Sequence, residues 1–236
     1  MKKHLFLLLC LYTSLHTYGQ KAYKLQSPDG NIQVSVSLSD KIYYNVTYRQ
    51  DTLLKQCNLQ MELSNQELGN APKLAGINKK SVDESLKPVI PLKYSTVANK
   101  YNQLLMKFEG DYSVEFRAFN DGIAYRFITN KKGMIEVYNE TFQVNFPENY
   151  LLHVQHPGGF KTAYEEEYKH IESKDWKTSD KMALLPILID THKDYKILIS
   201  ESDLADYPAL FLKSNGNNGM LSVFPKVPLE FGDDGD

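Results

Sequence analysis

The sequence feature that most constrains the fold is a run of alternating residues over 112–127. Its apolar members recur at every second position, and they are Val114, Phe116 and Ala118 in the first half and Ile123, Tyr125 and Phe127 in the second. This period places them on one face of a strand, as a half-buried strand requires. Between the halves, Asn120-Asp121-Gly122 predicts a three-residue turn in which Gly122 takes a positive φ. The segment therefore predicts a β-hairpin, and its aromatic content favours the centre of a large antiparallel sheet.

Further strands are predicted along most of the chain. The turn signature Ser27-Pro28-Asp29-Gly30 precedes the first of them. The predicted strands are 32–38, 42–48, 59–63, 104–108, 134–138, 141–146, 183–189, 195–199, 210–212 and 220–224. The segment 64–91 is polar and contains Gly and Pro, so it predicts a long irregular connection. Helical periodicity is not sustained anywhere after the N-terminal segment, and the pattern predicts an all-β antiparallel sandwich.

The N-terminus has the three parts of a secretory signal peptide. Met1, Lys2 and Lys3 begin a short basic region, an apolar run follows at 5–11, and small residues stand before a cleavage position after Gly19. The apolar run is too short to span a bilayer. Residues 1–19 are therefore expected to be removed, which leaves a domain at 20–236 in the periplasm of a Gram-negative bacterium or outside the cell. Cys57 is then the one remaining cysteine, so no internal disulfide is expected.

Charge and the C-terminal end give two further expectations. The formal net charge is -2, and the lysines are scattered among acidic residues. Nucleic-acid binders carry a concentrated basic surface, so a nucleic-acid partner is not expected, and neither is a membrane span. The sequence stops at Asp236, soon after a predicted strand. We therefore expect a fragment of a longer protein.

The strongest chemical candidate is an acidic triplet, Glu165-Glu166-Glu167, which lies between Tyr164 and Tyr168 in a polar loop. Clustered carboxylates are ligands for hard cations, and Ca²⁺ accepts several oxygens in loose geometry. An acidic triplet is nevertheless more often solvated loop surface, and composition alone favours that interpretation.

Other candidate motifs are weaker. His153 and His156 are three residues apart, a spacing that suits one metal only on a helix or turn, so ordinary packing is favoured. Trp176 could stack on a sugar ring, but a single Trp belongs more often to a core. No pattern selects two carboxylates for glycoside hydrolysis, and no Gly-x-Ser-x-Gly nucleophile motif occurs. The sequence therefore identifies no catalytic residue.

Several segments together resemble glycoside hydrolase family 97. They are Ser27-Pro28-Asp29-Gly30-Asn31, the segment 100–104 (KYNQL), the hairpin segment 116–126 (FRAFNDGIAYR) and the segment 197–207 (ILISESDLADY). The resemblance covers essentially the whole mature chain. It implies the N-terminal super-β-sandwich of that family, which is similar to galactose-mutarotase-like domains.

What the resemblance implies about function is more specific. Members of the family are secreted or periplasmic α-glucosidases and α-galactosidases acting on α-linked oligosaccharides, with the catalytic carboxylates on a separate (β/α)₈ barrel. The N-terminal sandwich packs on that barrel and lends one glutamate to an active-site calcium. The family segment matches 165–168 here, so Glu165 is the implied ligand, with Glu166 as the alternative if the loop shifts by one residue. A free-standing carbohydrate-binding module and an adaptor without ligand are the competing hypotheses.

Overall fold

The computed structural model describes residues 22–205 and 207–226, and the described chain contains strands and no helix. Its largest sheet has eight strands, and all their pairings are antiparallel. The path order is β1 (Ala22–Gln26), β2 (Ile32–Leu38), β3 (Ile42–Tyr48), β4 (Asp51–Leu63), β10 (Val137–Asn145), β16 (Gly219–Val223) and β15 (Phe211–Ser214), with β5 (Gln66–Leu68) paired to β4.

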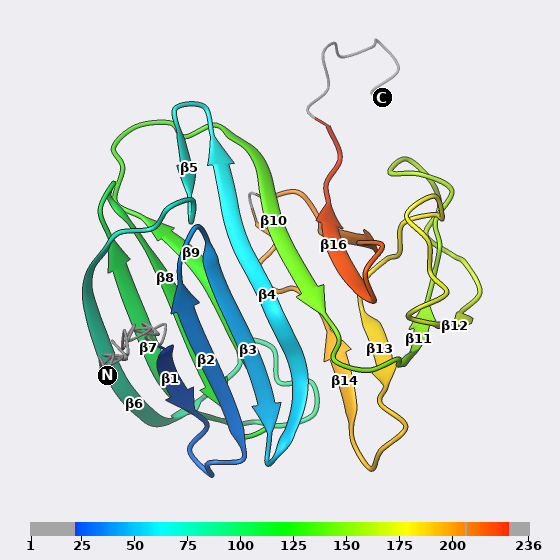
Figure 1. The fold of residues 1–236 in the computed structure, drawn as a ribbon. Helices are drawn as coiled ribbons and strands as arrows, with labels where there is room; N and C mark the ends of the chain where they lie inside the picture. Colours follow the sequence, from blue (N-terminus) through cyan, green and yellow to red (C-terminus); the bar gives the residue numbers. More distant parts are fainter. Residues whose placement is uncertain (1–21, 206, 227–236) are drawn as a thin grey trace, which may run out of the picture.

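Two four-stranded sheets complete the fold (Figure 1). One lies across the face of β1–β3, in the order β6 (Leu74–Leu86), β7 (Val97–Phe108), β8 (Tyr112–Phe119) and β9 (Gly122–Thr129). The other, here called the third sheet, lies on the side of β10 and β16. Its order is β12 (Lys169–Glu172), β11 (Leu151–Val154), β13 (Ile187–Asp190) and β14 (Lys196–Ile199).

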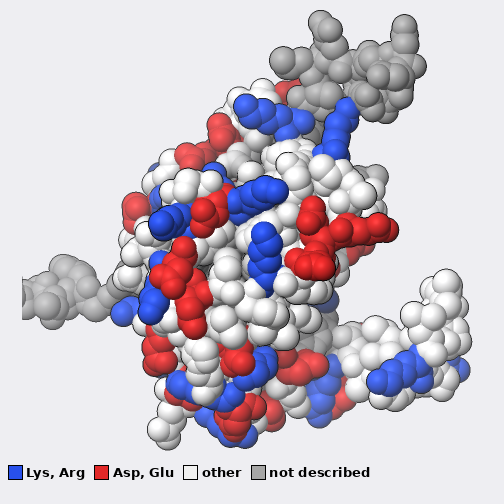
Figure 2. All heavy atoms as spheres, turned by 90° about the vertical axis from the view of Figure 1, so that its right-hand side faces the viewer, with Lys and Arg blue, Asp and Glu red and all other residues white. Residues whose placement is uncertain are grey.

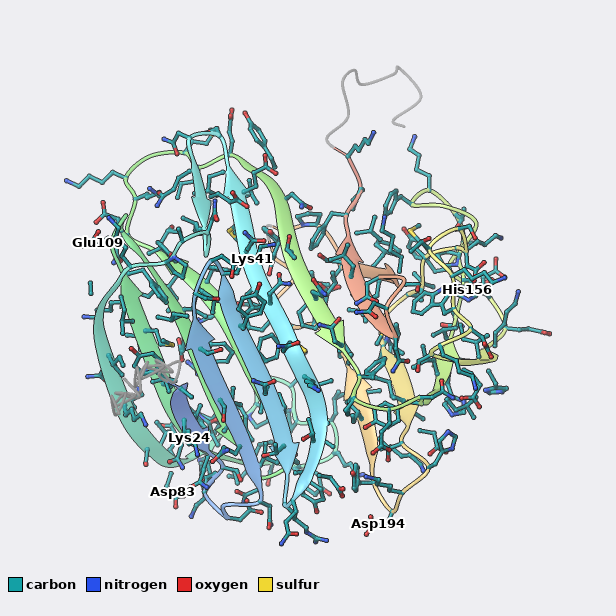
Figure 3. The ribbon with its side chains drawn as sticks, viewed as in Figure 1. Lys24, Lys41, Asp83, Glu109, His156 and Asp194 are labelled. Carbon is teal, nitrogen blue, oxygen red and sulfur yellow. The ribbon has the colours of Figure 1, made fainter. Side chains whose placement is uncertain are left out.

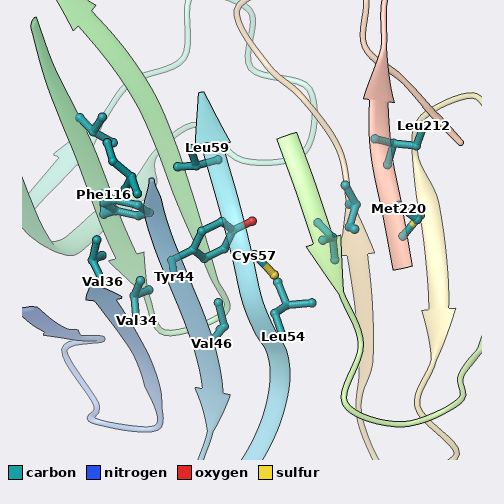
Figure 4. Packing of buried hydrophobic residues seen from close by; sticks show 14 of the residues in the cluster. Val34, Val36, Tyr44, Val46, Leu54, Cys57, Leu59, Phe116, Leu212 and Met220 are labelled. Atoms are coloured by element: carbon teal, nitrogen blue, oxygen red, sulfur yellow. The ribbon is translucent and has the colours of Figure 1, made fainter. Parts of the chain in front are cut away.

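One hydrophobic core joins the three sheets. Tyr44 on β3 and Phe116 on β8 are both fully buried, and their ring centroids are 6.0 Å apart between the two large layers (Figure 4). The same cluster continues through Leu212 and Met220 into the third sheet, where Leu152 is also fully buried. The predicted all-β sandwich is confirmed, because each layer buries one apolar face against another.

Cys57 lies in this core and is a free thiol. Burial raises the pKa of the Cys57 thiol to about 11, despite hydrogen bonds from its neighbours. The backbone N–H of Asn145 on β10 donates to its sulfur at 3.3 Å. Cys57 is thus a small apolar residue at the β4–β10 contact.

The hairpin at 112–127 forms, although two details of the prediction were wrong. Phe119 pairs with Gly122, so Asn120 and Asp121 alone make the turn, and Gly122 is an ordinary strand residue without positive φ. The hairpin also lies at one end of its sheet, since β9 is the last strand in the order. Phe116 and Tyr125 are instead covered by the facing sheet, where they pack against Tyr44 and Phe142. The Asn120 side chain accepts a hydrogen bond from Asp29 N at 3.0 Å, which joins this turn to the turn before β2.

The irregular connection predicted for 64–91 was wrong. β5 and β6 occupy much of this segment, and β6 pairs with β7 from Leu74 to Leu86. The sequence gives no alternating signal because most of β6 is exposed on both faces. Its backbone becomes a strand because β7 supplies the hydrogen-bonding partners, so tertiary context overrides local propensity.

Two other predicted strands merge into one. The strands expected at 134–138 and 141–146 are one strand, β10, whose register against β4 shifts between Val137 and Asn139. Met134 lies outside it and is almost fully exposed.

The proposed signal peptide and the chain end fall in 1–21 and 227–236, outside the described residues.

Glu115 on β8 is a buried carboxylate held by two arginines. Arg117 Nε donates to its Oε1 at 2.5 Å, and Arg126 donates from Nε and its terminal nitrogen to Oε2, each at 2.8 Å. Burial alone would raise the pKa of the Glu115 carboxyl, but the two arginines outweigh it and the net pKa is lowered.

We expect Glu115→Gln to lower the free energy of unfolding by about 1–2 kcal/mol near neutral pH, because it removes hydrogen bonds between charged groups. The folded-state pKa lies below the unfolded value, so this stabilisation is present above pH ~4.5 and is lost as the pH falls through the lowered pKa. Urea unfolding of both proteins between pH 7 and pH 3 should therefore show their stabilities converging in acid. Asp83→Asn, which breaks the exposed Asp83–Lys100 pair, is the control and should change stability by less than ~1 kcal/mol. A constant difference between wild type and Glu115→Gln across this range would contradict the assignment.

Candidate functional site

The acidic triplet lies in the long loop of a hairpin in the third sheet. β11 and β12 pair directly, with Val154 opposite Lys169, and the residues 155–168 connect them. The loop therefore leaves and re-enters the sheet at the same end of the two paired strands. The sequence prediction that Glu165, Glu166 and Glu167 belong to a loop is confirmed.

Side chains within this loop fasten it to the body of the protein. The Phe160 ring packs edge-on against Phe211 of β15 with centroids 5.0 Å apart, and the Tyr164 ring lies 5.9 Å from the same residue. The Tyr164 hydroxyl also donates to the carbonyl of Phe160, and Gln155 Nε2 donates to the carbonyl of Glu166. The ring contacts with Phe211 thus hold the loop against the sandwich, and the two hydrogen bonds brace the loop internally.

The three carboxylates themselves face solvent. Glu165, Glu166 and Glu167 are exposed, and within 22–205 and 207–226 none of their carboxylates has a hydrogen bond or ion pair. The same part of the chain holds no group of three or more His, Cys, Asp or Glu side chains able to surround a metal ion. The loop can therefore supply one or two oxygen ligands to a cation, while the remaining ligands would have to come from elsewhere.

The two histidines singled out in the sequence do not face each other. His153 on β11 has its Nδ1 2.6 Å from Nδ1 of His170 on β12. His156, which is labelled in Figure 3 among the yellow loops on the right, instead places its Nδ1 2.9 Å from the carbonyl of Met182. Its ring also packs against Trp176. The sequence favoured ordinary packing over metal binding for both histidines, and His156 does pack in this way. The partner of His153 was missed, because the pairing of His153 with His170 depends on the register across the loop.

Trp176 is a core residue, as the more conservative interpretation held. Its side chain is 3% exposed, and its indole N–H points to the carbonyl of Lys181 at 3.4 Å. It is therefore not available to stack on a sugar ring. Among the aromatic residues near the acidic loop, Tyr164 and Tyr168 are the exposed ones.

A second carboxylate cluster joins the segment 200–210 to the large sheet. Tyr125 donates to Oε1 of Glu140 at 2.9 Å, and Tyr207 also hydrogen-bonds this carboxyl. Burial raises the pKa of Glu140 more than these hydrogen bonds lower it. Burial likewise raises the pKa of Glu201, which accepts the backbone N–H of Leu210 at 3.0 Å. These carboxyls are satisfied by the protein and hold the segment in place.

Charge on the outer side of the third sheet is mixed. Figure 2 views the molecule from this side, and lysine, arginine, aspartate and glutamate side chains are interspersed there without a single-sign patch covering the face. No described helix is present that could cross a membrane.

The antiparallel sandwich has a counterpart among known families of domains. The model for the N-terminal region of glycosyl hydrolases of family 97 matches residues 25–228, and the chain belongs to this family. The resemblance deduced from the sequence is thereby confirmed.

Particular relatives are similar over nearly the whole chain. A retaining α-galactosidase of Bacteroides thetaiotaomicron is 34% identical over 97% of this chain. A solved family 97 enzyme from Pseudoalteromonas sp., in complex with acarbose, superposes with a TM-score of 0.74 at 20% identity, and a β-arabinopyranosidase superposes with 0.78 at 24% identity, each over 86% of this chain. These two structures establish the shared fold. The chain spans about a third of each relative's length, namely 36%, 32% and 35% respectively.

Proposed function

We propose that this chain is the non-catalytic N-terminal sandwich of a secreted or periplasmic α-glycosidase, and that it lends the Glu165 carboxylate to a calcium ion shared with a catalytic barrel. The observation that carries the proposal is the loop at 155–168, whose aromatic rings pack on Phe211 of the sandwich while its carboxylates have no partner among the described residues. A carboxylate placed in this way is free to complete a site formed with another domain. Membership in a glycosyl hydrolase family supports the same assignment.

The residues present suit calcium as a partial ligand set. Glutamate oxygens are hard ligands of the kind Ca²⁺ prefers, and one donor per contributing segment is enough when six to eight oxygens are gathered from several sources. Glu165 would hold the ion, with Glu166 as the alternative donor. A bound calcium supplies positive charge and a template for sugar hydroxyls. The sandwich positions the carboxylate, because Phe160 and Tyr164 restrict the loop against Phe211.

The substrate and the catalytic residues are assigned to the rest of the longer protein. The curated relative is a retaining α-galactosidase, and this chain aligns with 36% of it. We propose an α-linked oligosaccharide, glucoside or galactoside, as the substrate, and catalytic carboxylates on the barrel.

The experiment that tests the proposal uses the longer protein that contains this chain, assayed on p-nitrophenyl α-galactoside and α-glucoside. A calcium chelator should abolish hydrolysis and added Ca²⁺ should restore it. Glu165→Gln should lower kcat/KM at least tenfold at limiting Ca²⁺, because removing one oxygen ligand weakens the shared site. Glu167→Gln is the matched control and should retain activity, because it alters an equally exposed neighbour.

Loss of activity in Glu166→Gln with Glu165→Gln unaffected would move the ligand by one residue. Chelator-insensitive hydrolysis, with all three variants fully active, would contradict the calcium assignment. The alternative, a free-standing carbohydrate-binding module, is favoured by the exposed Tyr164 and Tyr168. It requires retardation of the 236-residue chain alone in starch or galactan gels, lost on Tyr168→Ala.

A further inference from the structure

The third sheet carries a pair of imidazoles that the calcium proposal does not use. His153 and His170 lie directly opposite each other on the adjacent antiparallel strands β11 and β12. Their rings are nearly perpendicular, at 77°, with centroids 4.7 Å apart and Nδ1 atoms 2.6 Å apart. The two nitrogens therefore converge on one point above the sheet.

The backbone beneath this pair is well supported. β11 is an inner strand, hydrogen-bonded to β12 on one side and to β13 on the other, where Leu188 lies opposite His153. The neighbouring residues Leu152 and Val154 are fully buried in the core on the opposite face. Side chains alternate across a strand, so the histidines occupy the outer face, held by a packed inner face. The two Cα positions are thus fixed before any ligand arrives.

Two facing ring nitrogens at this distance require a proton or a metal ion between them. Two lone pairs at this separation repel, so in the free protein one Nδ1 carries a proton and donates a hydrogen bond to the other Nδ1. A metal ion can replace that proton and accept both lone pairs. Tetrahedral zinc binds imidazole nitrogen at about 2.0–2.1 Å, which sets the two nitrogens about 3.3 Å apart. The rings must therefore separate by about 0.7 Å from the observed contact, a small rotation for side chains at the surface.

We propose that His153 and His170 form a two-ligand site for a divalent late-transition-metal ion such as Zn²⁺, distinct from the carboxylate of Glu165. Imidazole nitrogen suits zinc, copper and nickel, whereas calcium takes oxygen ligands. In the part of the chain that the structure describes, no third His, Cys, Asp or Glu side chain joins the pair. The ion keeps open positions for water or an added ligand, and its affinity is modest.

The proposal is tested by titrating ZnCl₂ into the 236-residue chain by calorimetry, with CaCl₂ as the second probe. One zinc ion should bind per chain, and ZnCl₂ should raise the thermal unfolding midpoint, because the pair forms only in the folded protein. His153→Gln and His170→Gln should each reduce zinc affinity at least tenfold and remove the midpoint shift. Excess CaCl₂ should not compete.

His156→Gln is the matched control, since His156 is near His153 in sequence but faces Met182 and Trp176. It should bind zinc as the wild type does. Absence of zinc binding to the wild-type chain would overturn the proposal. So would zinc affinity that survives both His153→Gln and His170→Gln, or that is lost only in His156→Gln.

Discussion

Replacement of Phe116 by Ala should lower the free energy of unfolding by about 3–5 kcal/mol, the largest effect we expect from a single substitution in this chain. Phe116 is fully buried on β8 and its ring packs against Tyr44 on the facing sheet and Tyr125 on β9. Truncation to Ala removes the transfer free energy of the ring and leaves a cavity between two sheets whose hydrogen-bonded backbones cannot collapse to fill it.

Urea or thermal unfolding followed by circular dichroism measures this effect. Phe119→Ala is the matched control, because Phe119 is three residues along the same strand, points to the opposite face and is only half-buried against Tyr101. It should cost about 1–2 kcal/mol. Equal losses for the two variants would contradict the assignment of Phe116 to the face between the sheets.

Replacement of Gly219 by Ala should destabilise the protein by about 2–3 kcal/mol. Gly219 begins β16 opposite Asn145 on β10, and a Cβ atom built there lies 2.2 Å from the carbonyl oxygen of Val144 and 3.0 Å from the Cα of Asn145. Both are backbone atoms within a paired strand, so relief requires β10 and β16 to move apart. That movement weakens the junction between the large sheet and the β15–β16 hairpin.

Gly122→Ala is the control for this prediction, since Gly122 is also a strand residue without positive φ but a Cβ there meets nothing within 4 Å. It should change stability by less than ~0.5 kcal/mol. Chemical denaturation of both variants gives the comparison. If Gly219→Ala were as stable as Gly122→Ala, the close approach of β16 to Val144 would be excluded.

Strands that bury one face could be predicted from the sequence, because burial imposes the period of two. β2 and β3 agree with the predicted ranges, and the paired residues Tyr112–Phe119 and Gly122–Thr129 form the predicted hairpin. β6 could not be predicted, because a strand exposed on both faces carries no alternating pattern and depends on β7 for its conformation. The turn at Asn120-Asp121 has two residues instead of the predicted three, because composition does not determine the number of residues in a hairpin loop.

The candidate site was predictable in part. An acidic triplet between aromatic residues indicated an exposed loop, and the loop is exposed. The anchoring of that loop on Phe211 was not predictable, since Phe211 lies far along the chain in another strand. The pairing of His153 with His170 was missed for the same reason, because contacts across a long connection depend on register. The metal role of Glu165 stays a prediction.

The polar character of β6 has a consequence for the behaviour of the protein in solution. β6 is the last strand of its sheet, so along its outer side backbone groups face away from β7. Such a strand can recruit a strand from a second molecule and begin aggregation. Lys79, Lys80, Asp83 and Glu84 lie along it and are exposed, and pairing with another copy would strip water from these charged side chains. The polar residues that deprive β6 of an alternating pattern thus also protect the sheet against self-association.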